Sequence, residues 1–210
     1  MIIKELFIDD EDTDYIDAIS LVNMPAIETD FMAFNSNKTQ YTYSKAIGDK
    51  MEIIGPALIK RLIYRWDPET GKDYYVYFSE KTIKKLSYNY MKKLRLNNAT
   101  IDHKTNADGI SIVESWLIED TQLDKSKIYG FDLPKGTWMI KMKVDNAEVW
   151  ERVKSGSLKG FSIECWMSEN VINKLSVDVK STEEQIKAVL NSDLSDNEKE
   201  NIVKRIIKEV

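Results

Sequence analysis

A histidine and a serine in this sequence could act as a base and a nucleophile, and both lie in segments that we predict to be strands. His103, the only histidine, ends the predicted strand 99–103 and precedes a polar turn. Ser162 lies within the apolar segment 160–166, which we interpret as a strand. A serine hydroxyl is a weak nucleophile at neutral pH and needs a neighbouring base, and His103 is the only imidazole in the chain. The alternative interpretations are an ordinary surface histidine and a serine on the polar face of a strand.

A third group would orient the imidazole and stabilise its cation. Side chains alternate between the two faces of a strand, so Glu164 shares a face with Ser162 while residues 161, 163 and 165 face the other way. Other candidate carboxylates are Glu114 and Asp17. Asp102 is disfavoured because neighbouring strand residues point to opposite faces.

Composition excludes several other classes of site. Lys and Arg number 30 against 35 Asp and Glu, a net charge of −5, which argues against a general nucleic-acid binder. A single cysteine, Cys165, allows no internal disulfide and no cysteine-based zinc site, and a single histidine allows no two-histidine metal site. The acidic segment 9–14 lacks the glycine and the final glutamate of a calcium loop, and we interpret it as a solvated turn. We expect neither a metal nor an organic cofactor.

The N-terminus has no basic region followed by an apolar core, so no signal peptide is predicted. No apolar run approaches the roughly 20 residues of a membrane-spanning helix. We therefore expect a cytoplasmic protein that does not interact with membranes.

Short apolar segments outnumber helical ones, which predicts an α+β, mostly β protein arranged around a barrel. A Gly55-Pro56 pair divides the apolar segment 53–64 into two predicted strands, and turn residues 67–71 then lead into a hairpin ending at Phe78. Ser79 is the predicted N-cap of a helix, and residues 145–148 form a capping box that opens a second one. We divide the chain into N-terminal strands (1–34), a polar linker or loop (35–50), a core (51–170) and a charged tail of two amphipathic helices (171–210).

Four sequence blocks, in order and in register, resemble the XkdF-like serine proteases of tailed phages, relatives of the prohead proteases that mature phage capsids. The blocks are Ile101-Asp-His-Lys-Thr105, Val113-Glu-Ser-Trp-Leu-Ile-Glu-Asp120, Leu133-Pro-Lys-Gly-Thr-Trp-Met139 and Lys159-Gly-Phe-Ser-Ile-Glu164. The resemblance covers roughly residues 50–167. It implies a fold similar to the herpesvirus assemblin barrel, with flanking helices.

The resemblance also implies a function and a site. The family's histidine corresponds to His103 and its nucleophile to Ser162. The protein would be a serine endopeptidase inside the phage procapsid in the host cytoplasm, with the scaffold protein, the major capsid protein and itself as substrates, and possible homodimerisation. The family's string Glu-Val-Ser-Leu-Val is similar to Ala18-Ile-Ser-Leu-Val22, which suggests a permuted strand order and places alanine where the family has its acid. Glu164, Glu114 or Asp17 would then be the third member, or the site would be a dyad. The alternative is an inactive head-assembly protein that binds scaffold or capsid subunits.

Overall fold

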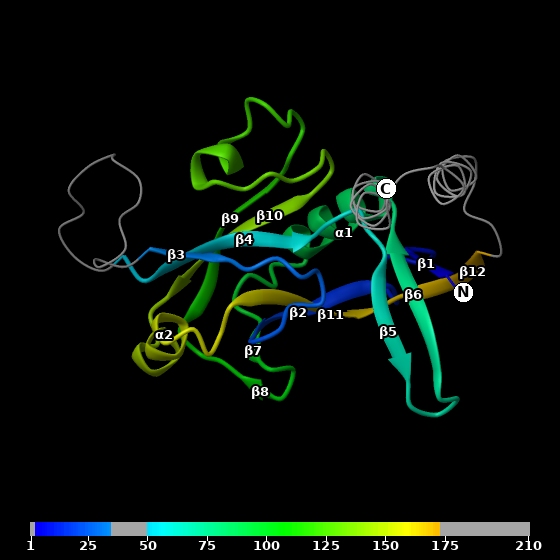
Figure 1. Ribbon diagram of the computed structural model, residues 1–210, viewed down its shortest axis with the longest axis horizontal. Helices are drawn as coiled ribbons and strands as arrows, with labels where there is room; N and C mark the ends of the chain where they lie inside the picture. Colours follow the sequence, from blue (N-terminus) through cyan, green and yellow to red (C-terminus); the bar gives the residue numbers. More distant parts are fainter. Residues whose placement is uncertain (1–2, 35–49, 173–210) are drawn as a thin grey trace, which may run out of the picture.

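The computed structural model describes residues 3–34 and 50–172, and strands dominate these ranges. The strands form three four-stranded sheets, with two α-helices and a short 3-10 helix around them (Figure 1). The prediction of a mostly β protein with a few helices is confirmed for these residues.

Each sheet combines strands from distant parts of the chain. The first has the order β12-β1-β6-β5, the second β3-β4-β10-β9 and the third β11-β2-β7-β8. The first sheet comprises β1 (Ile3–Phe7), β5 (Ile63–Asp67), β6 (Lys72–Phe78) and β12 (Ser168–Ile172). The second comprises β3 (Met32–Phe34), β4 (Glu52–Leu58), β9 (Ile110–Leu117) and β10 (Trp138–Val144). The third comprises β2 (Tyr15–Val22), β7 (Ala99–Ile101), β8 (Thr105–Asn106) and β11 (Gly160–Trp166).

The expected closed barrel is not found in residues 3–34 and 50–172. A barrel closes when its first and last strands hydrogen-bond to each other, whereas each of these sheets ends in two edge strands, such as β11 and β8 in the third. The alternation of apolar and polar residues predicts which face of a strand is buried. It carries no information on which strands pair, and closure depends on that pairing.

The N-terminal segment supplies an inner strand to two of the three sheets. β1 lies between β12 and β6, and β2 lies between β11 and β7. β2 runs antiparallel to β11 and parallel to β7, so it joins the two segments that contain Ser162 and His103. The position of residues 15–22 in the third sheet therefore determines the geometry of the candidate site.

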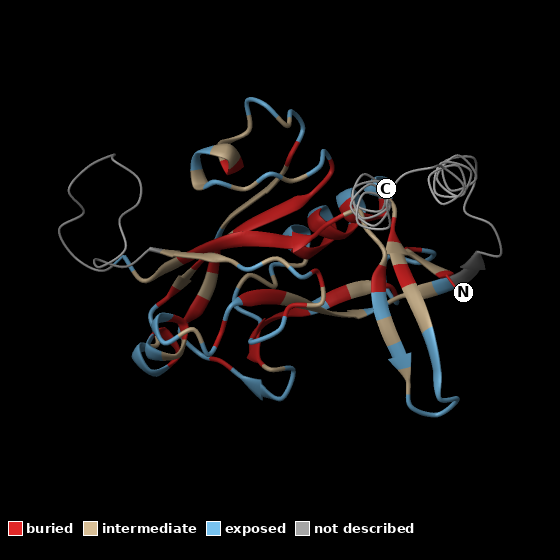
Figure 2. Cartoon of the chain, in the orientation of Figure 1, coloured by how far each residue is buried: buried red, intermediate tan, exposed pale blue. Residues whose placement is uncertain are grey.

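The buried core lies between the sheets, and the β5–β6 hairpin projects from it toward solvent (Figures 1 and 2). Trp138 of β10 is fully buried and contacts Tyr90 edge-on, with ring centroids 5.7 Å apart. Tyr90 comes from α1 (Glu80–Lys92), which also buries Ile83 and Leu86. The apolar face of α1 is thus buried, as its amphipathic pattern requires, and the Tyr90–Trp138 contact joins the helix to the second sheet.

The helix N-termini follow the predicted capping chemistry with one shift. Ser79 caps α1, and its hydroxyl accepts a hydrogen bond from the Thr82 amide at 3.3 Å. α2 (Ala147–Lys154) is capped by Asn146, which accepts from the Val149 amide at 3.1 Å, and so begins one residue later than a cap at Asp145 would give. Either side chain is a good N-cap, so the residue type alone could not separate the two positions.

The predicted break at Gly55-Pro56 is wrong, because β4 continues through both residues. Pro56 lies opposite Met139 next to a register shift in β10, and β3 pairs only with residues 52–54 of β4. Proline lacks the N–H group that a regular ladder needs and is tolerated at such irregular positions. A Cβ atom on Gly55 would lie 2.9 Å from the Phe31 Cβ, so glycine is required by the close approach of the neighbouring segment.

Two sequence predictions fall outside the described residues: nearly all of the linker at 35–50 and the helical tail after residue 172. The region assigned to the tail starts inside β12, which extends to Ile172. None of the helices in the described ranges is long and apolar enough to span a membrane.

Candidate active site

Polar side chains form a row across the third sheet. Ser162 of β11 pairs with Ser20 of β2, and Ser20 pairs with Thr100 of β7. Residues paired directly across neighbouring strands project from the same face. Glu164 is two residues from Ser162 and therefore belongs to that face too. Four strand residues with polar side chains are thus presented together in a sheet that is otherwise largely apolar.

Glu164 extends across β2 to reach the far side of this row. Its strand partner is Ala18, yet its Oε1 atom accepts a hydrogen bond from the Thr100 hydroxyl, on the strand beyond β2. The same oxygen lies 3.1 Å from Nδ1 of His103. Neighbouring strands are about 4.8 Å apart, so the carboxylate has to cross β2 at the level of Ala18. The small alanine leaves the space for this crossing, and a carboxylate thus reaches the site although residue 18 is not acidic.

His103 sits in a tight turn between β7 and β8. Asp102 has φ +51° and His103 has φ +57°, and the Lys104 amide donates to the Ile101 carbonyl at 3.0 Å. Positive φ at both central residues is the signature of a type I′ turn, which Asn-Gly and Asp-Gly normally fill. A histidine there costs about 1–2 kcal/mol of left-handed strain. Strained non-glycine residues concentrate at functional sites.

Ser20 connects the turn to the nucleophile strand. Its hydroxyl accepts a hydrogen bond from the His103 amide at 3.0 Å and donates to the Thr100 carbonyl at 3.4 Å. Ser20 is completely buried, so these bonds are shielded from water. Because Ser20 lies directly opposite Ser162, the backbone of His103 is held beside the residue that pairs with the candidate nucleophile.

Within the described ranges, no hydrogen bond joins the Ser162 hydroxyl to the His103 ring. The imidazole is partly exposed, with 43% of its side-chain surface accessible, and Glu164 contacts its Nδ1 atom. A carboxylate acceptor favours the proton on Nδ1, which leaves Nε2 as the nitrogen that can take a proton from a hydroxyl. Catalytic hydrogen bonds are often long without substrate and tighten only in the complex. The candidate base and its candidate orienting acid therefore lie on the sheet face that carries the serine.

The carboxylates of Asp17 and Asp102 have other partners. Asp17 forms an ion pair with Arg95, and its side chain projects from β2 on the face opposite to Ala18 and Ser20. Asp102 forms an ion pair with Arg152 of α2 at 3.0 Å, which fixes the turn that carries His103. Neither carboxylate has a hydrogen bond to the imidazole in the described structure.

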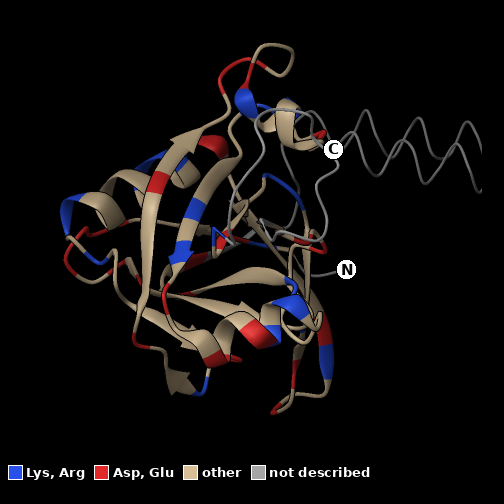
Figure 3. Cartoon of the chain, turned by 90° about the vertical axis from the view of Figure 1, so that its left-hand side faces the viewer, with Lys and Arg blue, Asp and Glu red and all other residues tan. Residues whose placement is uncertain are grey.

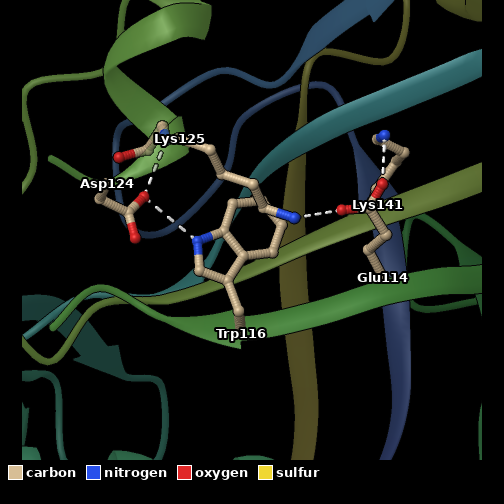
Figure 4. Close-up of polar contacts among 6 residues, drawn as sticks. Glu114, Trp116, Asp124, Lys125 and Lys141 are labelled. Atoms are coloured by element: carbon tan, nitrogen blue, oxygen red, sulfur yellow. Dashed lines mark hydrogen bonds and ion pairs between the residues drawn. The ribbon is translucent and has the colours of Figure 1, made fainter.

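Glu114 lies in a separate network on the second sheet (Figure 4). Its two carboxylate oxygens contact Lys125 and Lys141, and the Lys125 ammonium lies 3.8 Å from the centroid of the Trp116 ring. Burial opposes ionisation of Glu114, but the hydrogen bonds from the two lysines outweigh it and hold the pKa of this carboxyl below its usual value. Trp116 also donates to Asp124 at 3.2 Å, the N-cap of the 3-10 helix η1 (Lys125–Tyr129). Glu114 thus connects η1 to the sheet and does not contact His103.

Sequence reasoning missed Thr100 and Ser20. Thr100 fixes the carboxylate of Glu164, and Ser20 fixes the backbone of His103. Both are polar residues within apolar strand segments, at 8% and 0% exposure. A buried hydroxyl must be hydrogen-bonded. Two hydroxyl residues within apolar strands therefore indicated that each has a hydrogen-bond partner, but only the strand pairing identifies which residue it is.

Positively and negatively charged residues both occur throughout the fold in the view of Figure 3. No group of three or more histidine, cysteine, aspartate or glutamate side chains in residues 3–34 and 50–172 is arranged to hold a metal ion.

A serine, a histidine and a carboxylate on one sheet face define the residue set of a serine hydrolase. The model of one protein family, described as "Putative phage serine protease XkdF", matches residues 57–171, and the chain belongs to this family. The match includes His103, Ser162 and Glu164 and begins after β1 and β2. No curated protein and no solved structure matches the chain.

Proposed function

We propose that this protein is the prohead maturation endopeptidase of a tailed phage, which cleaves extensions of the scaffold and capsid proteins, and itself, inside the procapsid. The observation that carries the proposal is the contact between Glu164 and His103. This contact lies on the sheet face that presents Ser162, and Glu164 belongs to the same strand as Ser162. Membership of a phage serine protease family supports the choice of substrate class. The proposal includes kinship with the assemblin fold in a permuted form, because β2, with Ala18–Val22, lies beside the nucleophile strand. Homodimerisation is part of the same proposal.

The mechanism follows from the roles that each side chain can fill. Ser162 Oγ attacks the scissile carbonyl while its proton moves to Nε2 of His103, and the carboxylate of Glu164 stabilises the resulting imidazolium. The peptide C–N bond then breaks, and His103 returns the proton to the leaving amine. Water, deprotonated by the same imidazole, hydrolyses the ester formed on Ser162. Thr100 and Ser20 are positioning residues, since they hold Glu164 and the His103 backbone.

Co-expression with the scaffold and major capsid proteins encoded by the same phage tests this function. Intact-mass spectrometry should show defined truncations of these proteins with the wild type and none with Ser162→Ala. Ser155→Ala is the matched control, because this exposed serine is the C-cap of α2 and its hydroxyl bonds to the Arg152 carbonyl and the Ser157 hydroxyl. Uncleaved partners that remain bound to the wild-type protein would refute the protease and support an inactive head-assembly protein instead.

A further inference from the structure

A cavity of about 240 Å³ opens next to Ser162. Its lining comes from all three sheets, and most of the lining residues are hydrophobic, with Ala57 of β4, Ile63 of β5 and Phe161 of β11 among them. Ser162 itself is part of the lining, together with the charged residues Arg65 and Glu169. Phe161, Ile163 and Cys165 project from the face of β11 opposite to the Ser162 side chain, so the cavity lies beside the candidate nucleophile on the other face of its strand.

β11 is the edge strand of its sheet on the side where the cavity lies. The Ile19 amide bonds to the Asn98 carbonyl and the Leu21 carbonyl to the Asp102 amide, so these residues of β2 direct their backbone groups toward β7. Backbone groups alternate along a strand, so Ser20 directs its groups toward Ser162. Phe161 and Ile163 consequently direct theirs toward the outer edge.

Among the described residues, one hydrogen bond covers this outer edge, at the end where β11 begins. The Lys159 carbonyl accepts a hydrogen bond from the Phe31 amide at 2.6 Å, just before β11 begins. Beyond it, β11 pairs only with β2 in the part of the chain that the structure describes. A strand edge with free backbone groups, beside a side-chain pocket, is the arrangement that binds an extended peptide by strand addition.

We propose that the substrate pairs along the outer edge of β11 and places one apolar side chain, that of the residue whose carbonyl Ser162 attacks, in this cavity. The proposal rests on the proposed protease function and names the substrate class of that same site. Small-molecule sites have volumes of roughly 300–1,000 Å³, so a cavity of about 240 Å³ suits a single side chain.

The charged residues around the cavity further restrict which substrate side chain it can bind. Glu169 is paired with Lys4 at 2.7 Å, whereas the Arg65 guanidinium donates to the Tyr64 carbonyl at 3.1 Å. Arg65 therefore disfavours a basic substrate side chain. Burial raises the pKa of the Cys165 thiol to about 11 although Arg65 opposes this shift, so this part of the lining is uncharged at neutral pH. The expected residue is aliphatic or aromatic.

Whether the cavity binds an apolar group can be measured by comparing hydrolysis of p-nitrophenyl acetate and p-nitrophenyl hexanoate by the full chain. The rate of Ser162→Ala is subtracted from each. Each methylene buried contributes about fourfold, so kcat/KM should favour hexanoate by at least ~10-fold in the wild type. Ala57→Val fills the cavity and should reduce the preference to below ~3-fold. Ala107→Val is the matched control, since Ala107 is buried outside the cavity, and should keep the wild-type preference.

A fluorophosphonate probe separates the two proposals, because its reaction with Ser162 requires the activated nucleophile but no pocket. Suppose that the probe labels Ser162 but the wild type shows no preference for hexanoate, or that Ala57→Val leaves the preference unchanged. Either result would overturn the cavity assignment and leave the proposed protease function standing. Absence of both labelling and esterase activity in the wild type would overturn the proposed function and the assignment with it. Circular dichroism of Ala57→Val checks that the variant is folded, and Cys165→Ala provides a second test because it enlarges the cavity and should extend the preference to octanoate.

Discussion

The contact between Glu164 and His103 predicts how much the carboxylate contributes to catalysis. Because Thr100 and His103 both contact Oε1 of Glu164, the amide oxygen in Glu164→Gln can accept both hydrogen bonds. The substitution therefore removes the charge while it keeps the tautomer and the geometry. What is lost is the attraction between the carboxylate and the imidazolium that forms during acylation.

The magnitude follows from the exposure of the pair. Two unit charges about 4 Å apart attract by about 1 kcal/mol in water and about 4 kcal/mol at the effective dielectric of a protein surface. The side chains of His103 and Glu164 are 43% and 30% exposed, which places the pair between these limits. We expect a loss of about 2–3 kcal/mol, or roughly 30–150-fold in the acylation rate.

Pre-steady-state release of p-nitrophenol from p-nitrophenyl acetate measures this rate, because the small acyl group is indifferent to the cavity beside Ser162. Glu114→Gln is the matched control, since its carboxylate is bound by two lysines on another sheet, and should change the rate by less than ~2-fold. In a His103→Ala background, Glu164→Gln should have no further effect. Equal rates for Glu164→Gln and the wild type would refute the role of Glu164 and favour a dyad.

Three further predictions concern the site and its frame. His103→Gly should be about 1 kcal/mol more stable than His103→Ala in urea unfolding, because both lack the imidazole and only glycine is unstrained at φ +57°; equal stabilities would contradict the type I′ turn. Burial raises the pKa of the Cys165 thiol from 9.0 to about 11. At pH 8 this thiol should therefore react with a disulfide reagent roughly 10-fold more slowly in the folded protein than in urea, because the folded protein holds about 100-fold less thiolate and the higher nucleophilicity of that thiolate offsets part of the loss. Equal rates would place the thiol in solvent. Burial raises the pKa of Asp14, but hydrogen bonds from the Asp9 amide, the Ser168 hydroxyl and the Asp10 amide outweigh it and hold this pKa below 3.8. Asp14→Asn should therefore cost about 1 kcal/mol of unfolding free energy at pH 7, and this difference should vanish as the pH falls through the lowered pKa of Asp14; a constant difference would exclude the ionised carboxylate as its source.

Most of the strands could be predicted from local pattern, because each has an apolar face that only burial explains. β11 matches its predicted range of 160–166. The predicted strand 99–103 was too long, because β7 ends at Ile101 and residues 102 and 103 form the turn. The interpretation of segment 9–14 as a solvated turn was incomplete, since Asp14 is 5% exposed and bonded to its own turn and to β12. The short strands β3 and β8 carry too few residues for a period to be recognised, and they form because longer neighbours offer them a pairing edge.

The candidate site was predictable in part. Placing Glu164 on the face of Ser162 needed only the period of a strand, and the single histidine left one choice of base. The route of Glu164 over Ala18 to Thr100 was not accessible from sequence, because it depends on which strand lies between β11 and β7. The roles of Ser20 and Thr100 were hidden for the same reason. Three residues far apart in the chain become neighbours only when β2 inserts between two later segments.

Mass-spectrometric mapping of the fluorophosphonate adduct tests most directly whether Ser162 is an activated nucleophile. The wild-type protein should carry one adduct, on the peptide that contains Ser162, and both His103→Ala and the urea-unfolded protein should carry none. An adduct on another serine, or labelling of Ser162 that persists at the same rate in His103→Ala, would contradict the catalytic pair.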